Sequence, residues 1–160
     1  MPRLSWSMLL ILTLLLAAAG CSRQEEAKTE HPKATEKQRA RVVVPDNVKG
    51  QWRAVKIAVR DKESNTEDIY TVNIGYEFVV AGSELRLKVE NFLPAFIMDG
   101  TKMTSASNET RNPAVQIIVT EGGAEIFEGW LFSLYPGTHA FEHQRYNFSL
   151  VDFIPAGKKG

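Results

Sequence analysis

A strict alternation of apolar and charged side chains is the feature that most restricts how this chain can fold. Residues 85–90 read LRLKVE, so three aliphatic residues alternate with three charged ones. In a strand, this period places the aliphatic side chains on one face and the charges on the other. The pattern is typical of an antiparallel sheet with one face on a core and the other in water.

The same period recurs in the rest of the chain. Further strands are predicted over residues 54–60, 69–74, 115–119, 124–132 and 145–153. In the last of these segments one side is expected to carry Tyr146, Phe148, Leu150 and Asp152. These patterns predict an all-β fold, either an antiparallel β-sandwich or a partly open barrel of about seven or eight short strands.

Turn residues separate the predicted strands. Residues 81–83 predict a tight turn, and residues 121–123, with two glycines, predict a hairpin connection. Residues 99–113 are polar and predict a long loop. Pro136 and Gly137 open another irregular stretch, with one helical turn expected around residues 139–142.

The N-terminus predicts export from the cytoplasm. Arg3 precedes an apolar run of 12 residues, 8–19, interrupted only by Thr13. A membrane-spanning helix needs roughly 20 apolar residues, so this run is too short. A cationic start, a short apolar run and small residues before Cys21 are similar to a bacterial lipoprotein signal. We therefore expect residues 1–20 to be a signal peptide and Cys21 to carry the lipid.

Two alternatives to lipidation stay open. Residues 17–19 are all Ala and also fit an ordinary A-x-A cleavage site, which would release a soluble protein starting at Gly20. The segment could instead stay uncut as an anchor. Cys21 is the only cysteine, and a lone exposed thiol in an oxidising compartment would invite intermolecular pairing, which favours lipidation. In the sorting scheme that such signals imply, Ser22 rather than Asp predicts the outer membrane, with the domain facing the periplasm.

The mature chain divides into a tether and a domain. Residues 22–41 contain no Val, Ile, Leu, Met or aromatic residue, so residues 21–41 are predicted to be a flexible, lipid-anchored tether. Their six Lys/Arg and four Glu leave an alternative in which the tether binds peptidoglycan or anionic lipid. Residues 42–160 are predicted to form a single β-rich domain. Their 12 Lys/Arg and 15 Asp/Glu argue against a nucleic-acid partner, which requires a basic face.

The stretch 126–152 reads IFEGWLFSLYPGTHAFEHQRYNFSLVD. Its skeleton F-x-G-W-x-F-x-x-x-P, followed by E-H-x-x-Y, resembles an uncharacterised bacterial envelope family, the domain of unknown function twenty-one fifty-five. The matching positions are Phe127, Gly129, Trp130, Phe132, Pro136, Glu142, His143 and Tyr146. The resemblance implies a secreted or anchored envelope protein of undetermined activity. It also implies a pair of cysteines near the places where this chain has Asn91 and Phe153.

One cluster in this stretch has the composition of a chemical site. His139, Glu142 and His143 form H-x-x-E-H, which on a helix could bind zinc. Zinc peptidases with this motif need a further Glu on a second long helix, and only 17 residues follow His143. The favoured interpretation is that Glu142 and His143 hydrogen-bond backbone at the entry to the final strand. We therefore expect no metal, no cofactor and no catalytic residue.

The aromatic residues of the same stretch have two interpretations. In a strand, Trp130 and Phe132 share one face and Phe127 lies on the other. They are expected to fill the core, because aromatic side chains bury so much area, but they could also line a ligand groove. Gly129 would mark a bulge or a close backbone approach.

These features together favour binding over catalysis. No nucleophile elbow, phosphate loop or dinucleotide fingerprint is present in the sequence. We expect a lipid-anchored bacterial envelope protein, held at the membrane through Cys21, whose β-domain binds a protein partner or a cell-wall component such as peptidoglycan. One alternative is a zinc-dependent hydrolase centred on His139, Glu142 and His143. Another is a small-solute binding protein with a cavity inside the sandwich.

Overall fold

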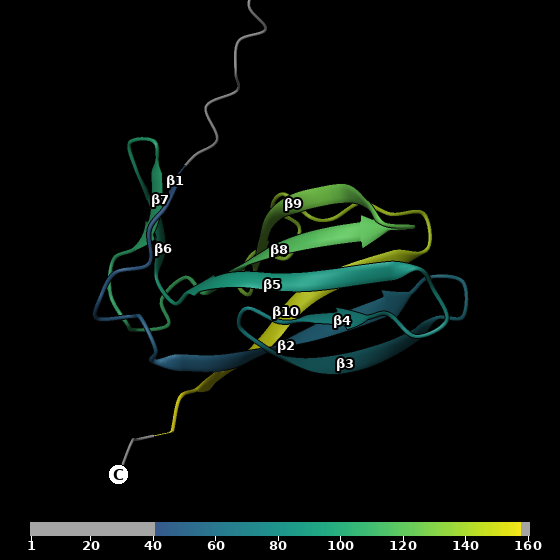
Figure 1. Cartoon of the computed structure of the whole chain (residues 1–160), viewed down its shortest axis with the longest axis horizontal. Helices are drawn as coiled ribbons and strands as arrows, with labels where there is room; N and C mark the ends of the chain where they lie inside the picture. Colours follow the sequence, from purple (N-terminus) through teal and green to yellow (C-terminus); the bar gives the residue numbers. More distant parts are fainter. Residues whose placement is uncertain (1–40, 158–160) are drawn as a thin grey trace, which may run out of the picture. The chain divides into compact units, whose positions relative to one another are not determined.

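The computed structural model describes residues 41–157, which belong to one compact unit (Figure 1). All regular structure in this range is β-strand, so the predicted all-β class is confirmed. No helix in the described range is long and apolar enough to cross a membrane. The predicted signal peptide, the lipidation of Cys21 and the tether up to residue 40 lie outside the described residues.

Seven strands build a two-layer sandwich of antiparallel pairs. The first sheet has the order β10-β2-β3, with bounds Tyr146–Pro155, Trp52–Asp61 and Thr66–Asn73. The second sheet has the order β4-β5-β8-β9, with bounds Glu77–Val79, Leu85–Leu93, Ala114–Glu121 and Ala124–Phe132. Of the two predicted architectures, the strands therefore adopt the sandwich.

A small third sheet stands at one end of the sandwich (Figure 1). Its order is β1-β7-β6, with bounds Arg41–Val42, Lys102–Ser105 and Phe96–Asp99. β6 and β7 form a hairpin in which Asp99 pairs with Lys102, and Gly100 has the positive φ of 61° that such a tight turn requires. The predicted long loop over residues 99–113 is therefore wrong in its first part.

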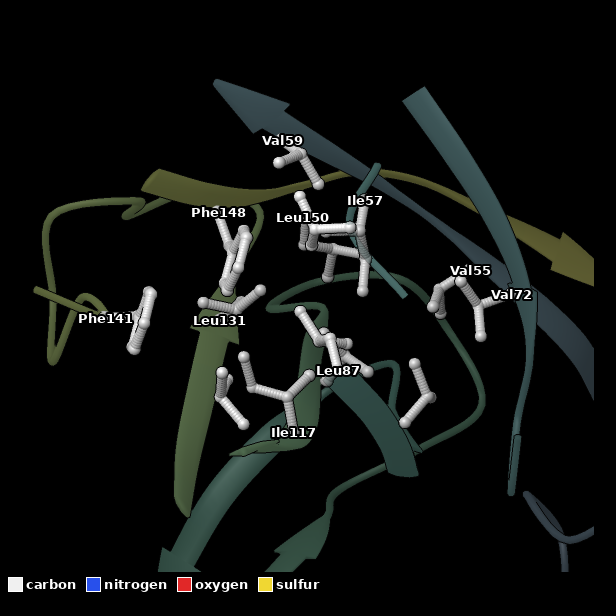
Figure 2. Close-up of a cluster of buried hydrophobic side chains, with 14 of the residues drawn as sticks. Val55, Ile57, Val59, Val72, Leu87, Ile117, Leu131, Phe141, Phe148 and Leu150 are labelled. Atoms are coloured by element: carbon white, nitrogen blue, oxygen red, sulfur yellow. The ribbon is translucent and has the colours of Figure 1, made fainter. Parts of the chain in front are cut away.

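The main core lies between the two large sheets (Figure 2). Leu85, Leu87 and Val89 are fully buried, as their alternation predicts, whereas Arg86 and Lys88 are exposed. Figure 2 shows Ile57, Phe148 and Leu150 of the first sheet pointing toward Leu87 and Ile117 of the second. Removal of this apolar area from water is the main force that holds the sheets together.

Two bulges reverse the alternation of side chains. In β5, a register shift between Val89 and Asn91 turns Phe92 into the main core. In β10, a shift between Leu150 and Asp152 turns Phe153 inward and leaves Asp152 outside, 2.9 Å from Lys56. The prediction that Asp152 shares a side with Tyr146, Phe148 and Leu150 is wrong, because one extra residue exchanges the two faces of a strand.

Candidate functional site

A second group of buried apolar residues lies on the outer face of the β4-β5-β8-β9 sheet. Leu93, Ala114, Trp130 and Phe132 form this outer cluster. The small sheet covers it, since the ring of Phe96 meets the rings of both Trp130 and Phe132 edge-on with centroids 5.0 Å apart. Edge-on packing of this kind is a favourable aromatic geometry. The outer cluster therefore joins the small sheet to the sandwich.

A groove of about 660 Å³ opens between the small sheet and β9. Its apolar lining consists of Phe96, Met98, Met103, Phe127, Trp130 and Phe132. Glu128 and Gly129 of β9 and residues 138–140, from the turn region after β9, complete the lining. Trp130 and Phe132 are thus packed in the outer cluster and also border the groove, so both predicted interpretations of these aromatic residues describe part of their surroundings.

β9 is an edge strand of its sheet in the described part of the chain. The backbone N–H of Ser133 donates to the carbonyl of Pro113 at 3.0 Å, which extends the β8–β9 ladder by one hydrogen-bonded pair. Such pairs alternate along an antiparallel ladder with pairs whose backbone groups point away from the partner strand. The backbone N–H and C=O of Trp130 and Phe132 consequently point away from β8.

Gly129 is required where Phe127 folds back along β9. The two residues share a face, and a Cβ at Gly129 would overlap the ring of Phe127. That ring also packs edge-on against Phe141 at 5.4 Å and touches the main core. Gly129 itself pairs regularly with Ile117, and the bulge in this ladder lies near Ile126 instead. The predicted close approach is therefore made by a side chain rather than by backbone.

His143 has a structural role at the entry to β10. Its Nδ1 accepts hydrogen bonds from the backbone N–H groups of Arg145 and Tyr146 at 3.2 and 3.1 Å. The ring lies between those of Phe141 and Tyr146, each 5.7 Å away, and Nε2 is 3.4 Å from a carboxylate oxygen of Glu121. An Nδ1 that accepts two bonds requires the neutral ring with its proton on Nε2. This is the backbone contact that the sequence analysis favours for His143.

The other members of the predicted motif are spread out. Pro136 begins an exposed turn that ends at His139, closed by a hydrogen bond from Thr138 N–H to the Tyr135 carbonyl at 2.9 Å. His139 has a φ of 51°, and residues 140–145 contain no helix, so the predicted helical turn around residues 139–142 is wrong. Glu142 is exposed and borders a separate shallow depression with His143 and Lys62.

In residues 41–157, no group of three or more His, Cys, Asp or Glu side chains lies close enough together to hold a metal ion. The structure brings Phe127, Gly129, Trp130 and Phe132 together at the groove. It places Tyr146 in the main core instead. Six of the eight matching positions therefore serve two regions, one that forms the groove and one that anchors β10, whereas Pro136 and Glu142 are exposed and lie in neither.

A salt bridge ties the start of β10 to the end of β2. Arg145 donates from Nε and Nη2 to one oxygen of Asp61 at 3.0 and 2.7 Å. The other Asp61 oxygen accepts the backbone N–H of Glu63 at 2.9 Å. Hydrogen bonding to the Arg145 guanidinium holds the pKa of Asp61 well below its usual range. Asp61 therefore stays ionised and fastens the hairpin turn after β2.

Sequence reasoning missed all the groove residues that come from the small sheet, Phe96, Met98 and Met103. All three belong to the hairpin that was predicted as loop or left unassigned. The Asp99–Gly100 pair is a known hairpin signal and sits between these residues, so it could have identified the turn. What it could not identify is which sheet the hairpin covers.

Comparisons with protein-family models, with curated proteins and with solved structures find no match to this chain. Membership in the family of the domain of unknown function twenty-one fifty-five therefore stays a prediction.

Proposed function

We propose that this protein is a lipid-anchored bacterial envelope protein whose β-domain binds, without catalysis, an extended apolar segment of a protein partner. The observation that carries the proposal is the groove beside β9. It presents aromatic and thioether side chains next to an edge strand. Edge strands can add an extended peptide through backbone hydrogen bonds, while adjacent pockets select its side chains.

Exposed apolar side chains support the same proposal. Met98 in β6 is 60% exposed, and the loop after β9 exposes Leu134 and Tyr135. Apolar surface near a recessed aromatic lining is typical of protein interaction sites. The main core, by contrast, consists of buried side chains packed between the sheets, so the groove gives the protein-binding proposal more support than the solute-binding alternative receives.

The zinc hydrolase has less support than the binding module. Its motif needs His139 and His143 on one helical face, and the segment that holds them is not helical. His143 Nδ1 already accepts two backbone hydrogen bonds. Zinc binding would require this segment to refold and His143 to give up these bonds, whereas partner binding in the groove requires neither change.

Site-specific photo-crosslinking in cells tests the groove. A photoreactive amino acid at Met98 should capture one defined partner, whereas the same probe at Glu67 in β3, on the opposite sheet, should not. Phe96→Ala should abolish the Met98 crosslink because the groove loses a wall. A probe that captures nothing at Met98, or the same proteins at both positions, would contradict the proposal.

The anchor is tested separately. Mass spectrometry of the N-terminal peptide of the mature protein should find Cys21 as the first residue, with lipid attached. Cys21→Ser should prevent lipid attachment and processing while the domain still folds. A mature protein that starts unmodified at Gly20 would contradict the lipid anchor but leave the groove's binding role intact.

A further inference from the structure

We propose that the mouth of the groove is a Cu(I) site, in which the thioethers of Met98 and Met103 and the imidazole of His139 bind the ion beside the indole of Trp130. All four residues line the same groove. The proposal does not rest on the protein partner, although the site shares the groove with it, and two of the three ligands, Met98 and Met103, lie outside the H-x-x-E-H pattern.

The two methionines are the first observation. Met98 and Met103 are the only methionines after Met8, which lies in the predicted signal peptide. They stand directly opposite each other in the β6–β7 ladder, so both side chains project from one face of the hairpin. Cβ atoms of such a pair lie about 4.5–5.5 Å apart, and flexible methionine side chains can bring two sulfur atoms to one ion. Because Met98 is 60% exposed, packing does not account for its position.

His139 supplies the third donor. It lies in the turn region that completes the groove lining, and its φ of 51° is a left-handed conformation that a histidine adopts at an energetic cost. Strain of this kind is concentrated at functional sites. Within residues 41–157 the His139 ring makes no hydrogen bond, unlike that of His143, so either of its ring nitrogens can serve as the ligand.

Trp130 fixes the position of one of the two sulfur atoms. Its Nε1 donates to Sδ of Met103 at 3.1 Å, which fixes that sulfur at the groove wall. A thioether sulfur has two lone pairs, so the second is open to a metal. The indole is therefore in contact with a ligand sulfur, so its fluorescence should report an ion bound there.

The two thioethers and the imidazole together favour a soft, singly charged ion. Thioether ligands are soft and favour Cu(I), whereas Mg²⁺ and Ca²⁺ require several oxygen ligands. The carboxylate that borders the groove, Glu128, accepts a hydrogen bond from Gln116 at 3.3 Å. Two neutral sulfurs and one neutral imidazole provide no charge to compensate a divalent ion. Ag(I), which shares the softness and charge of Cu(I), should bind in the same place.

The test uses the full-length chain in detergent under anaerobic conditions, with Cys21→Ser in every sample so that no thiol competes. Cu(I) is titrated against a chromophoric Cu(I) chelator, and Ag(I) is titrated by calorimetry. We expect one equivalent of either ion, no Zn²⁺ binding, and quenching of tryptophan fluorescence that Trp130→Phe removes while Trp52 still emits.

Ligand variants complete the test. Met98→Leu, Met103→Leu and His139→Asn should each weaken Cu(I) binding by about 100-fold or more, since even an outer-shell partner is worth about 10–100-fold. Met98→Leu and His139→Asn change exposed residues, so circular dichroism and the thermal midpoint should stay unchanged in these two variants. Met103→Leu conserves volume but removes the acceptor of the Trp130 N–H, so its thermal midpoint should fall slightly while its circular dichroism stays that of the parent protein.

Control variants His31→Ala and Met8→Leu should bind as before. Absence of Cu(I) binding, unchanged affinity in Met98→Leu, or loss of affinity in either control would overturn the site. The photoreactive probe at Met98 itself removes one sulfur ligand, so a partner crosslink from that probe does not depend on Cu(I) and tests the proposed protein binding separately.

Discussion

The main core and the outer cluster are both made of buried apolar side chains, but they have different surroundings. The main core lies between two sheets, and residues such as Leu87, Ile117 and Phe148 have almost no exposed area. The outer cluster has a sheet on one side and only a short hairpin on the other, and its two aromatic residues border an open groove. An apolar cluster that is closed on one side only can hold the fold and still present a surface to a ligand.

Removal of a large side chain from each region should give the largest difference. Phe148→Ala leaves a cavity between the two sheets and should cost about 3–5 kcal/mol of unfolding free energy. Phe132→Ala should cost less than half as much, because solvent and the hairpin can occupy the vacated space from the groove. Urea denaturation of both variants measures the difference, and equal losses would show that the outer cluster is as closed as the main core.

Gly129→Ala should have an intermediate effect and tests the connection between the two regions. The added methyl group must displace the Phe127 ring, which packs on the main core and lines the groove. Overpacking of this kind costs about 1–3 kcal/mol. Phe127→Leu should recover part of the loss in the double variant. Simple addition of the two losses would mean that the ring and the methyl group do not compete.

The Asp61–Arg145 pair should make the first sheet sensitive to acid. The pKa of Asp61 is lowered in the folded state, so the stabilisation is complete above the ordinary carboxyl pKa of about 4 and is lost as the pH falls below it. In the parent protein the thermal midpoint should therefore fall as the pH drops below about 4, and in Asp61→Asn this fall should be smaller. Phe96→Ala, at the groove, should keep the slope of the parent protein.

Met98→Leu should have the smallest effect on folding. Its side chain is largely exposed, so the free energy of unfolding should change by no more than about 0.5 kcal/mol. The same change removes a groove sulfur, so stability and Cu(I) affinity should separate in this variant. A large loss of stability would place Met98 in the packed part of the outer cluster.

Residues near each other in the chain determined the features that were predictable. The alternation in residues 85–90 depends only on the geometry of one strand, and it correctly predicted the buried Leu85, Leu87 and Val89. The opposite faces of Trp130 and Phe127 follow from the same geometry, and the structure places them in the outer cluster and against the main core. The turn residues at 81–83, 121–123 and 136–137 correctly separated the strands on either side of them.

The tertiary structure decided the rest, because the deciding partners lie far apart in the sequence. The bulge at Val151 is set by pairing with β2, roughly ninety residues earlier in the chain, and no local pattern marks it. The groove exists because β9 is an edge strand and because the Phe96–Ser105 hairpin folds over Trp130 and Phe132. Met103 and His139 border one groove although 36 positions separate them. A sequence determines which face of a strand is apolar, but only packing decides what that face meets.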